Sequence, residues 1–520
     1  MSNAERVIYI EEPRLRVGHN QKCEYVKDGL FAFGPLKPIP GNSALRFGVI
    51  GTTDAHRRFD RWARDVRQGI PAEPGKSHRM SWPGFSAVFE SDWPEEPLVR
   101  VTVDGKQVLD AIHRRNRREA VYEAVGIFES AILKHLESHE LKPDFWFVVI
   151  DEEVWKLGRP EQVVAATVRT ESKLPMSPKA ASKALEGGNQ LLFSEWQDEA
   201  EQTLAVEGYE VNFHNQLKAR LIAHQVVVQI LRETTITPDE FVDTRGNPRR
   251  RVDDPATIAW NVCTTAFFKA QGRPWQLEGV RPGVCYVGLA FKQLQQSASG
   301  ANACCGAQMF LDSGDGVVFR GVEGNWYETD SKEYHLSEEK AFELMRLVLQ
   351  NYTQAYGAAP KELFIHGQTQ FNKAEWRGFQ RAVTESTALS GIRIRRSRDS
   401  RLYLAEGATP VLRGVGLVLS PSKGLLWSRG YVPRLQTYPG WEVPTPIEVD
   451  ILRGPASIDQ VLTDVFGLTK LNYNACIFGD GMPVTLRFAN AVGEILTSIP
   501  ASANPQRQQD FRPLPFRYYI

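Results

Sequence analysis

Hydrophobic positions in the first half of the chain occur either as short continuous runs or at helix-like spacing. The runs LRFGVIGT (45–52) and DFWFVVID (144–151) have the length and composition of buried strands. Each is adjacent to an amphipathic stretch: AHRRFDRWARDV follows the first run, and REAVYEAVGIFESAILKHLES precedes the second. Strands that alternate with crossover helices predict a parallel sheet covered by helices on both faces.

Two further segments extend this pattern toward residue 279. FHNQLKARLIAHQVVVQILRETT (213–235) predicts one helix that runs into a strand. PATIAWNVCTTAFFKAQG (255–272) predicts a helix with Pro near its start and Gly just past its end. We therefore interpret residues 41–279 as one Rossmann-like α/β domain with an irregular insertion near 155–205.

The pattern changes at about residue 280, after the Gly- and Pro-rich stretch GRPWQLEGVRPG. A strand (VCYVGLAFKQL), a hairpin (AQMFLDSGDGVVFRGV), a helix, the strand ELFIHG and another helix then follow one another. That order is typical of a ribonuclease H-like domain, here 280–520. Residues 1–40 contain only the short strand VIYI and a Gly/Pro-rich stretch, and we interpret them as an arm laid against a domain.

Composition adds limits to this picture. The 520 residues, 42% hydrophobic and 24% charged, fit a globular protein of about two to four domains. The N-terminus lacks a signal-peptide layout, and no run of eighteen apolar residues occurs, so we expect no membrane span. The six cysteines form no CxxC pair, as expected for reduced thiols in a cytoplasmic protein.

Formal net charge is zero, but basic residues are clustered in three places: HRRNRR (113–118), RGNPRRR (245–251) and RIRRSRDSR (393–401). Each cluster alone is typical of a solvated face, and the last also fits an exposed edge strand protected by charge. The three together favour a polyanionic partner.

Several separated segments give the chain a family resemblance: YIEEPRLRVGHNQKCEYVKDGLFAFGPL, FHNQLKARL, KAQGRPWQL, YVGLAF, ELFIHG, LTKLNYN and RFANAVGEIL. In this order they resemble the MID domain and the following PIWI domain of Argonaute proteins. The 520 residues are too few to include the N-terminal and PAZ domains of long Argonautes as well. The chain therefore resembles a short prokaryotic Argonaute. The resemblance implies a MID domain at 41–279 and a ribonuclease H-like PIWI domain at 280–520.

The MID resemblance implies a pocket for the 5′-phosphate of a guide strand. His214 and Lys218 are four residues apart and share a face near the electropositive start of a helix. The family motif adds Gln229, on the following strand, and Lys269. The alternative is ordinary surface lysines, although a Gln inside an apolar strand is unusual because a buried amide needs a partner.

The chain ends in PLPFRYYI, which is apolar and aromatic to the last residue. In the family, the terminal carboxylate often holds a divalent cation beside the guide phosphate. Ile520 is therefore a candidate metal ligand through its carboxylate, with Mg²⁺ as the expected ion. The alternative is an apolar tail docked for stability alone.

The PIWI resemblance implies that the nuclease centre is degenerate. Slicing members hold two Mg²⁺ ions with four side chains, and here Ala290, Gln368 and Asn490 occupy three of those positions, with Gly367 beside the second. A methyl group binds no metal, and neutral amides replace carboxylates poorly. Asp312, Asp315 and Asp480 are nearby in sequence but are interpreted as turn residues.

Short Argonautes without these ligands are encoded beside an APAZ-containing effector, often a TIR or sirtuin-like NADase. The resemblance implies a heterodimer in which this chain binds guide RNA and recognises single-stranded DNA of a plasmid or phage. Target binding, with oligomerisation of the complex, would then activate the partner, deplete NAD⁺ and cause abortive infection.

Two alternatives remain. One is a guide-dependent nuclease with relocated metal ligands. The other is a small-molecule Rossmann enzyme, which FGVIGTT supports poorly because it lacks the GxGxxG spacing.

Overall fold

The computed structural model of the chain describes residues 5–41, 44–74, 79–160, 162–186, 194–293, 302–311, 316–325, 327–328, 333–397, 399–403, 406–407, 409–438, 440, 442–500 and 513–520. Among the described residues, no helix is long and apolar enough to cross a bilayer.

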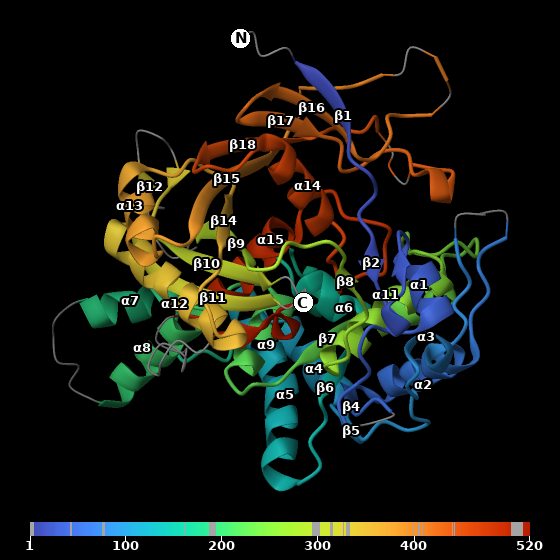
Figure 1. The fold of residues 1–520 in the computed structure, drawn as a ribbon. Coiled ribbons are helices and arrows are strands. Elements are labelled where there is room, and N and C mark those ends of the chain that lie inside the picture. Colours follow the sequence, from blue (N-terminus) through green and yellow to red (C-terminus); the bar gives the residue numbers. More distant parts are fainter. Residues whose placement is uncertain are drawn as a thin grey trace.

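A four-stranded sheet in the order β5–β4–β6–β7 forms the centre of the first half (Figure 1). Its strands are β4 (Phe47–Gly51), β5 (Val99–Thr102), β6 (Phe145–Ile150) and β7 (Val228–Arg232). Every neighbouring pair is parallel. All residues of β6 are buried, as in a strand that is covered on both faces. The predicted parallel sheet is confirmed.

Helices form a separate apolar core on each face of this sheet. On one face lie α2 (Thr53–Gln68) and α11 (Pro255–Lys269), which bury Phe59 and Trp260. The other face is covered by α4 (Gly105–Ile112), α5 (Arg117–Ser138) and α9 (Phe213–Ile222). The predicted insertion contains the helices α6 (Glu152–Leu157), α7 (Pro178–Glu186) and α8 (Ser194–Glu207).

The second half is built on a ten-stranded sheet in the order β1–β16–β17–β18–β15–β14–β9–β10–β11–β19, in which β17 is Lys423–Leu426. Its middle contains β9 (Val284–Gln293), β10 (Asn302–Leu311), β11 (Gly316–Asn325), β14 (Glu362–Gly367) and β15 (Ala388–Arg396). Strand β10 is antiparallel to β9 and β11, whereas β14 is parallel to β9 and β15. This is the strand order of the ribonuclease H fold, as the sequence predicts.

Successive side chains of these strands point to opposite faces. On one face, Cys285, Val287 and Leu289 pack with α12 (Glu338–Tyr356) and α13 (Lys373–Ala382). On the other face, Tyr286 packs in a core with α14 (Ile458–Leu468) and α16 (Ala489–Thr497). The sheet is therefore covered on both sides, and the end of β9 is directed at α16.

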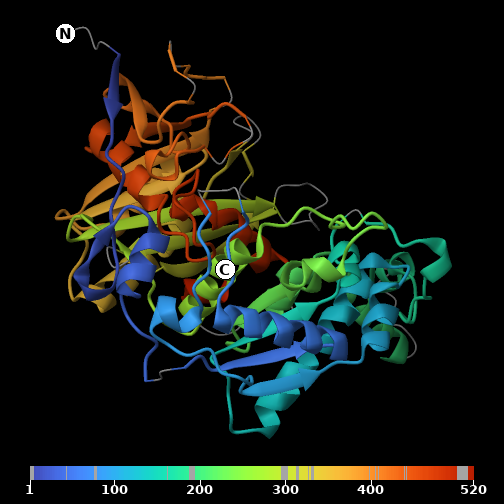
Figure 2. The ribbon, with the colours of Figure 1, turned by 90° about the vertical axis from the view of Figure 1, so that its right-hand side faces the viewer.

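The N-terminal arm contacts both halves of the molecule (Figures 1 and 2). Strand β1 (Arg6–Tyr9) pairs with β16 (Val415–Ser420) at one edge of the large sheet. Strand β2 (Leu15–Arg16) pairs with β8 (Gln276–Leu277), and α1 (Val26–Phe33) follows. The largest apolar core joins arm, both sheets and the C-terminal residues. The boundaries at 40 and 279 therefore separate parts that share one core, and they stay predictions.

Two of the three basic clusters contain arginines that are paired within the protein. Strand β15, which carries RIRR, is interior to the sheet and not an edge strand, because it pairs with both β14 and β18 (Ile447–Arg453). Arg393 and Arg395 form ion pairs with Asp450 and Glu448 of β18, at 2.8 and 2.6 Å. In HRRNRR, Arg114, Arg117 and Arg118 donate to main-chain oxygens of residues 112, 114, 157, 171, 207 and 209. These groups support the fold more than they offer free charge.

Candidate nucleic-acid-binding site

Helix α9 begins next to the end of the insertion and is fixed at its start by a side-chain cap. The Asn212 side-chain oxygen accepts a hydrogen bond from the Asn215 amide at 3.2 Å. Phe213, Leu217 and Leu221 of α9 pack into the core over β6 and β7. That packing leaves the row containing His214 and Lys218, one helical turn apart, on a different face of the helix. Lys218 is only 4% exposed.

Lys218 and Lys269 meet at the C-terminal residues of the chain. The Lys218 ammonium donates to the main-chain oxygen of Tyr519 at 3.1 Å. The Lys269 ammonium donates to the Val228 oxygen at 2.6 Å and to the main-chain oxygen of Ile520. In the described residues, both ammonium groups thus bond only main-chain oxygens, and no side-chain carboxylate neutralises them.

Gln229 faces the same region. Strand geometry places Gln229 on one face with Val227 and Leu231, and both of these belong to the core that contains α11 and Ile520. Its side-chain oxygen is buried and has no hydrogen-bond partner among the described residues. A buried amide oxygen without a partner is costly, so this atom is well placed for a ligand that supplies a proton or a cation.

Burial and mutual repulsion set the protonation of this cluster. Burial lowers the pKa of Lys218 to about 7. Burial, and then the neighbouring Lys218, lower the pKa of Lys269 well below its usual value. Burial, and then the charge of Lys218, lower the pKa of His214 to about 3. His214 is therefore neutral near pH 7, and the carboxyl oxygen of Ile520 is the one acidic group found against the two lysines among the described residues. An entering anion would be stabilised by the protonated lysines and could accept a hydrogen bond from His214.

The tail reaches this cluster from the large sheet. Strand β19 (Leu514–Pro515) pairs with β11, and the turn Phe516–Tyr518 leads to the buried residues Tyr519 and Ile520. In Figures 1 and 2 the C-terminal end lies at the centre of the molecule, between the two sheets. The apolar tail is thus docked between the two halves, with its main-chain oxygens on the two lysines.

A second basic group next to His214 could not be recognised from the sequence. The guanidinium of Arg159 lies 4.0 Å from the centroid of the Trp155 ring, and that of Arg232 lies 4.5 Å from it. Arg159 also contributes to the lowered pKa of His214, which places its charge near the pocket. The only sequence signal would have been WKLGR directly after a buried strand, and such a short basic stretch is not specific.

The three degenerate metal positions come together at one end of the large sheet. His366 of β14 pairs in register with Gly288 of β9, so Gln368 and Ala290 each lie two residues further along parallel neighbours. Helix α16, which contains Asn490, packs on β9. The side chain of Asn490 lies outside the described residues, whereas Gln368 is exposed and Ala290 is partly buried. The register places the positions of Ala290 and Gln368 side by side on neighbouring strands, and the assignment of all three positions as former metal ligands stays a prediction.

An ion pair lies where the sheet faces α16. Lys292 shares its face of β9 with Ala290 and forms an ion pair of 3.1 Å with Glu494 of α16. Glu210 is also near: burial raises its pKa to about 7, with Lys292 opposing and Glu494 adding to the shift. The ammonium of Lys292 thus neutralises part of the negative charge of these carboxylates. Among the described residues, no group of three His, Cys, Asp or Glu side chains could hold a metal ion.

The aspartates interpreted as turn residues have different outcomes. Asp312 and Asp315 lie outside the described residues. Asp480 is 5% exposed, and its carboxylate accepts from the Gly481 amide at 2.8 Å and from Arg487 at 2.8 Å. Asn472 donates to it at 3.1 Å as well. These bonds tie the loop to α15 (Val484–Arg487), and Asp480 has a structural role.

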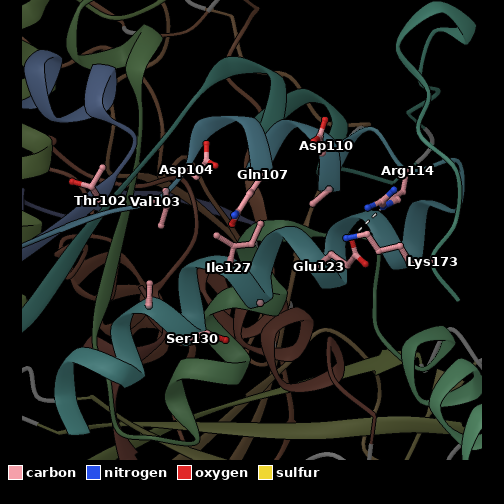
Figure 3. A pocket seen from close by; sticks show the side chains of 13 residues that line it. Thr102, Val103, Asp104, Gln107, Asp110, Arg114, Glu123, Ile127, Ser130 and Lys173 are labelled. Atoms are coloured by element: carbon pink, nitrogen blue, oxygen red, sulfur yellow. Dashed lines mark hydrogen bonds and ion pairs between the residues drawn. The ribbon is translucent and has the colours of Figure 1, made fainter. Parts of the chain in front are cut away.

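A hollow of about 810 Å³ between α4 and α5 has a different character (Figure 3). At one end Arg114 bonds Glu123 at 3.2 Å, and Lys173 lies 4.0 Å from the same carboxylate. At the other end Asp104 caps α4 through the Lys106 amide. Its cations are matched by acidic partners, so this hollow does not resemble a phosphate site.

Comparisons with known proteins find a match only among solved structures. No protein family and no curated protein matches the sequence. The structure of Clostridium butyricum Argonaute bound to a guide DNA and a 19-mer target DNA is similar with a TM-score of 0.61 and 14% identity. The match covers 96% of this chain and 54% of that one.

A second match is Aa-Ago with externally bound siRNA, with a TM-score of 0.54 and 11% identity over 99% of this chain and 56% of that one. The chain thus spans about half the length of the solved structures it matches. Together with the parallel four-stranded sheet and the ribonuclease H strand order, these similarities show that the chain has the MID–PIWI architecture of Argonaute proteins.

Proposed function

We propose that the chain binds the 5′-phosphate of a guide RNA at His214, Lys218, Gln229 and Lys269. The observation that carries this proposal is the meeting of two buried ammonium groups without a side-chain carboxylate partner among the described residues. A phosphate dianion would offset their repulsion and bond to several donors at once. Arg159, which lies over Trp155 beside this pocket, would contact the next nucleotide, whereas Arg232 is already bonded to the Glu152 carboxylate at 2.6 Å.

The same pocket fits a divalent cation such as Mg²⁺. Hard Mg²⁺ prefers oxygen ligands, and the unpartnered Gln229 oxygen and the main-chain carboxyl oxygen of Ile520 are of that kind. When bound, the ion would neutralise part of the phosphate charge. The chain itself would contribute the two ammonium groups and the docked tail that brings Ile520 to the site.

We further propose that the PIWI domain recognises target DNA without cutting it. Ala290 and Gln368 supply no anionic metal ligand, and Lys292 places a positive charge on the same strand face as Ala290. The guide would select complementary single-stranded DNA of a plasmid or phage by base pairing. Target binding would then activate an APAZ-containing TIR or sirtuin-like partner, with oligomerisation, and lead to abortive infection through loss of NAD⁺.

The decisive experiment is to identify the nucleic acid that co-purifies with the protein. We expect short RNA that is degraded by ribonuclease, resists deoxyribonuclease, and accepts a kinase label only after phosphatase treatment. That pattern indicates 5′-phosphorylated guide RNA. Protein that remains free of nucleic acid, and that does not bind synthetic 5′-phosphorylated RNA either, would contradict the proposal.

A pH dependence should accompany guide binding. The pKa of Lys218 is lowered to about 7 without guide, and a bound phosphate must raise it, so binding takes up a proton. Affinity for 5′-phosphorylated RNA is therefore expected to fall by up to about tenfold per unit between pH 7 and 9. Titrations with 5′-phosphate and 5′-hydroxyl guides measure this, and equal pH slopes for the two guides would refute the assignment of Lys218.

A further inference from the structure

Lys27, in helix α1 of the arm, is a buried lysine without a partner. It is 5% exposed, and among the described residues it forms no hydrogen bond or ion pair. Its ammonium lies over the Trp260 ring, 5.5 Å from the ring centroid. Burial lowers the pKa of this group. A buried ammonium of this kind destabilises the folded protein unless an anion or a hydrogen-bond acceptor binds to it.

Lys27 lines a cavity of about 350 Å³ between the arm, the start of α11 and two loops of the PIWI half. The walls combine aromatic rings with positive charge. Tyr25 and Phe478 lie on one side with their ring centroids 5.5 Å apart, and Tyr438 also faces the cavity. Arg429, which is 57% exposed, stands at its opening.

Two other cations of the lining are already engaged, and the lining also contains the carboxylate of Asp253. Arg413 is bonded to Glu12 at 3.1 Å and to Thr469 at 2.7 Å. Arg79 forms a 2.7 Å ion pair with Asp254, the carboxylate that also caps α11. Asp253 and Asp254 act on Lys27 only at longer range. Arg429 lies 3.9 Å from the Asp480 carboxylate, in a long ion pair at an exposed position. Among the described residues, the Lys27 ammonium is therefore the buried cation of the lining that lacks an anionic partner, and Arg429 is the cation at the opening that an anion could draw away from Asp480.

We propose that this cavity binds a single nucleotide unit, with its base against Tyr25 and Phe478 and its phosphate at Lys27 and Arg429. Aromatic rings stack on any nucleobase, and a buried cation beside them selects the attached phosphate. The volume is that of a small-ligand pocket. The unit is either a free nucleoside monophosphate or the terminal nucleotide of a bound strand.

This site is separate from the guide 5′-phosphate pocket. Thr257, near the start of α11, lines the cavity, whereas Lys269 at the end of the same helix belongs to the phosphate pocket. A helical rise of 1.5 Å per residue puts these two positions about 18 Å apart. Failure of the guide-binding proposal would leave the cavity and Lys27 unchanged, so the two proposals are tested independently.

The test is direct binding of AMP, adenosine and inorganic phosphate to the full chain by calorimetry. AMP is expected to bind at least about tenfold more tightly than either fragment, because the base and phosphate contacts add. Lys27→Met keeps the apolar stem and should weaken AMP binding by about tenfold or more. Lys37→Met, at an exposed arm lysine, is the matched control and should bind as the unaltered protein does.

Arg429→Gln provides a second variant at an exposed position that leaves the core intact, and it should also weaken AMP binding. If loading a guide blocks AMP, the natural occupant is a strand terminus; if AMP binds regardless of guide, it is a free nucleotide. Absence of AMP binding at millimolar concentration would overturn the proposal. So would a Lys27→Met protein that melts at a higher temperature but binds AMP unchanged, since that result indicates a purely structural lysine.

Discussion

Replacing His214 and Lys218 together by Ala is expected to abolish co-purification of guide. Hydrogen bonds to charged groups contribute about 1.5–3 kcal/mol each, so loss of two contacts weakens binding by roughly a hundred-fold or more. The fold should persist, because the core side of α9 is formed by Phe213, Leu217 and Leu221 and is untouched. Removing a buried ammonium also lowers the cost of folding.

The control for this prediction uses the chemistry of the guide as well as that of the protein. A 5′-hydroxyl RNA already lacks the phosphate, so the double variant should bind phosphorylated and hydroxyl guides almost equally. Lys134→Ala with His139→Ala, at exposed positions of and after α5, is a matched pair and should retain the preference. If the phosphate preference survives in the His214 and Lys218 variant, the pocket lies elsewhere.

The sequence predicted the architecture well because both halves follow strong local rules. Buried strands such as 145–150 are continuous apolar runs, and the helices between them have clear caps, including Asn116 for α5 and Asp254 for α11. Their alternation leaves few possible topologies. In the second half, the strand–hairpin–helix–strand–helix order alone indicated the ribonuclease H fold.

The proposed pocket can be recognised in the sequence only through the resemblance. His214 and Lys218 are related by one helical turn, but Lys269 joins them because α11 and β7 pack in the same core. No local sequence pattern predicts the bonds of the two ammonium groups. Lys218 bonds Tyr519, 301 residues later, and Lys269 bonds Ile520, 251 residues later. Such contacts depend on how the PIWI half docks against the MID half.

The clusters of basic residues also predicted little about the site, because their partners come from distant parts of the chain. RIRRSR reads equally well as a channel lining or as a charged edge strand. In the structure Arg393 is matched to Asp450, 57 residues later, because β15 and β18 are neighbours. Lys27 illustrates the opposite case: no prediction from the sequence concerns this lysine, which the fold buries beside Trp260 and the cavity. Burial of single charges is a property of tertiary packing.

The protein is expected to show no guide-dependent cleavage of a complementary target, with either Mg²⁺ or Mn²⁺. Two-metal nucleases need carboxylates that hold both ions on the scissile phosphate. Ala290 and Gln368 offer none, and the Lys292–Glu494 pair adds a competing ammonium beside them. Because metal-dependent acceleration is commonly a million-fold or more, loss of these ligands reduces cleavage to the uncatalysed background.

The measurement is a time course on labelled single-stranded DNA and RNA targets of guide-loaded protein. The same preparation must shift the target on a native gel, so that absent cleavage reflects absent chemistry and not inactive protein. A cut at a fixed distance from the guide 5′-end would contradict our interpretation and favour relocated ligands. Glu210→Gln and Glu494→Gln would then identify them, because these two carboxylates are coupled through Lys292 on the face of the sheet that carries Ala290. Loss of the cut in either variant would assign the metal site to that cluster.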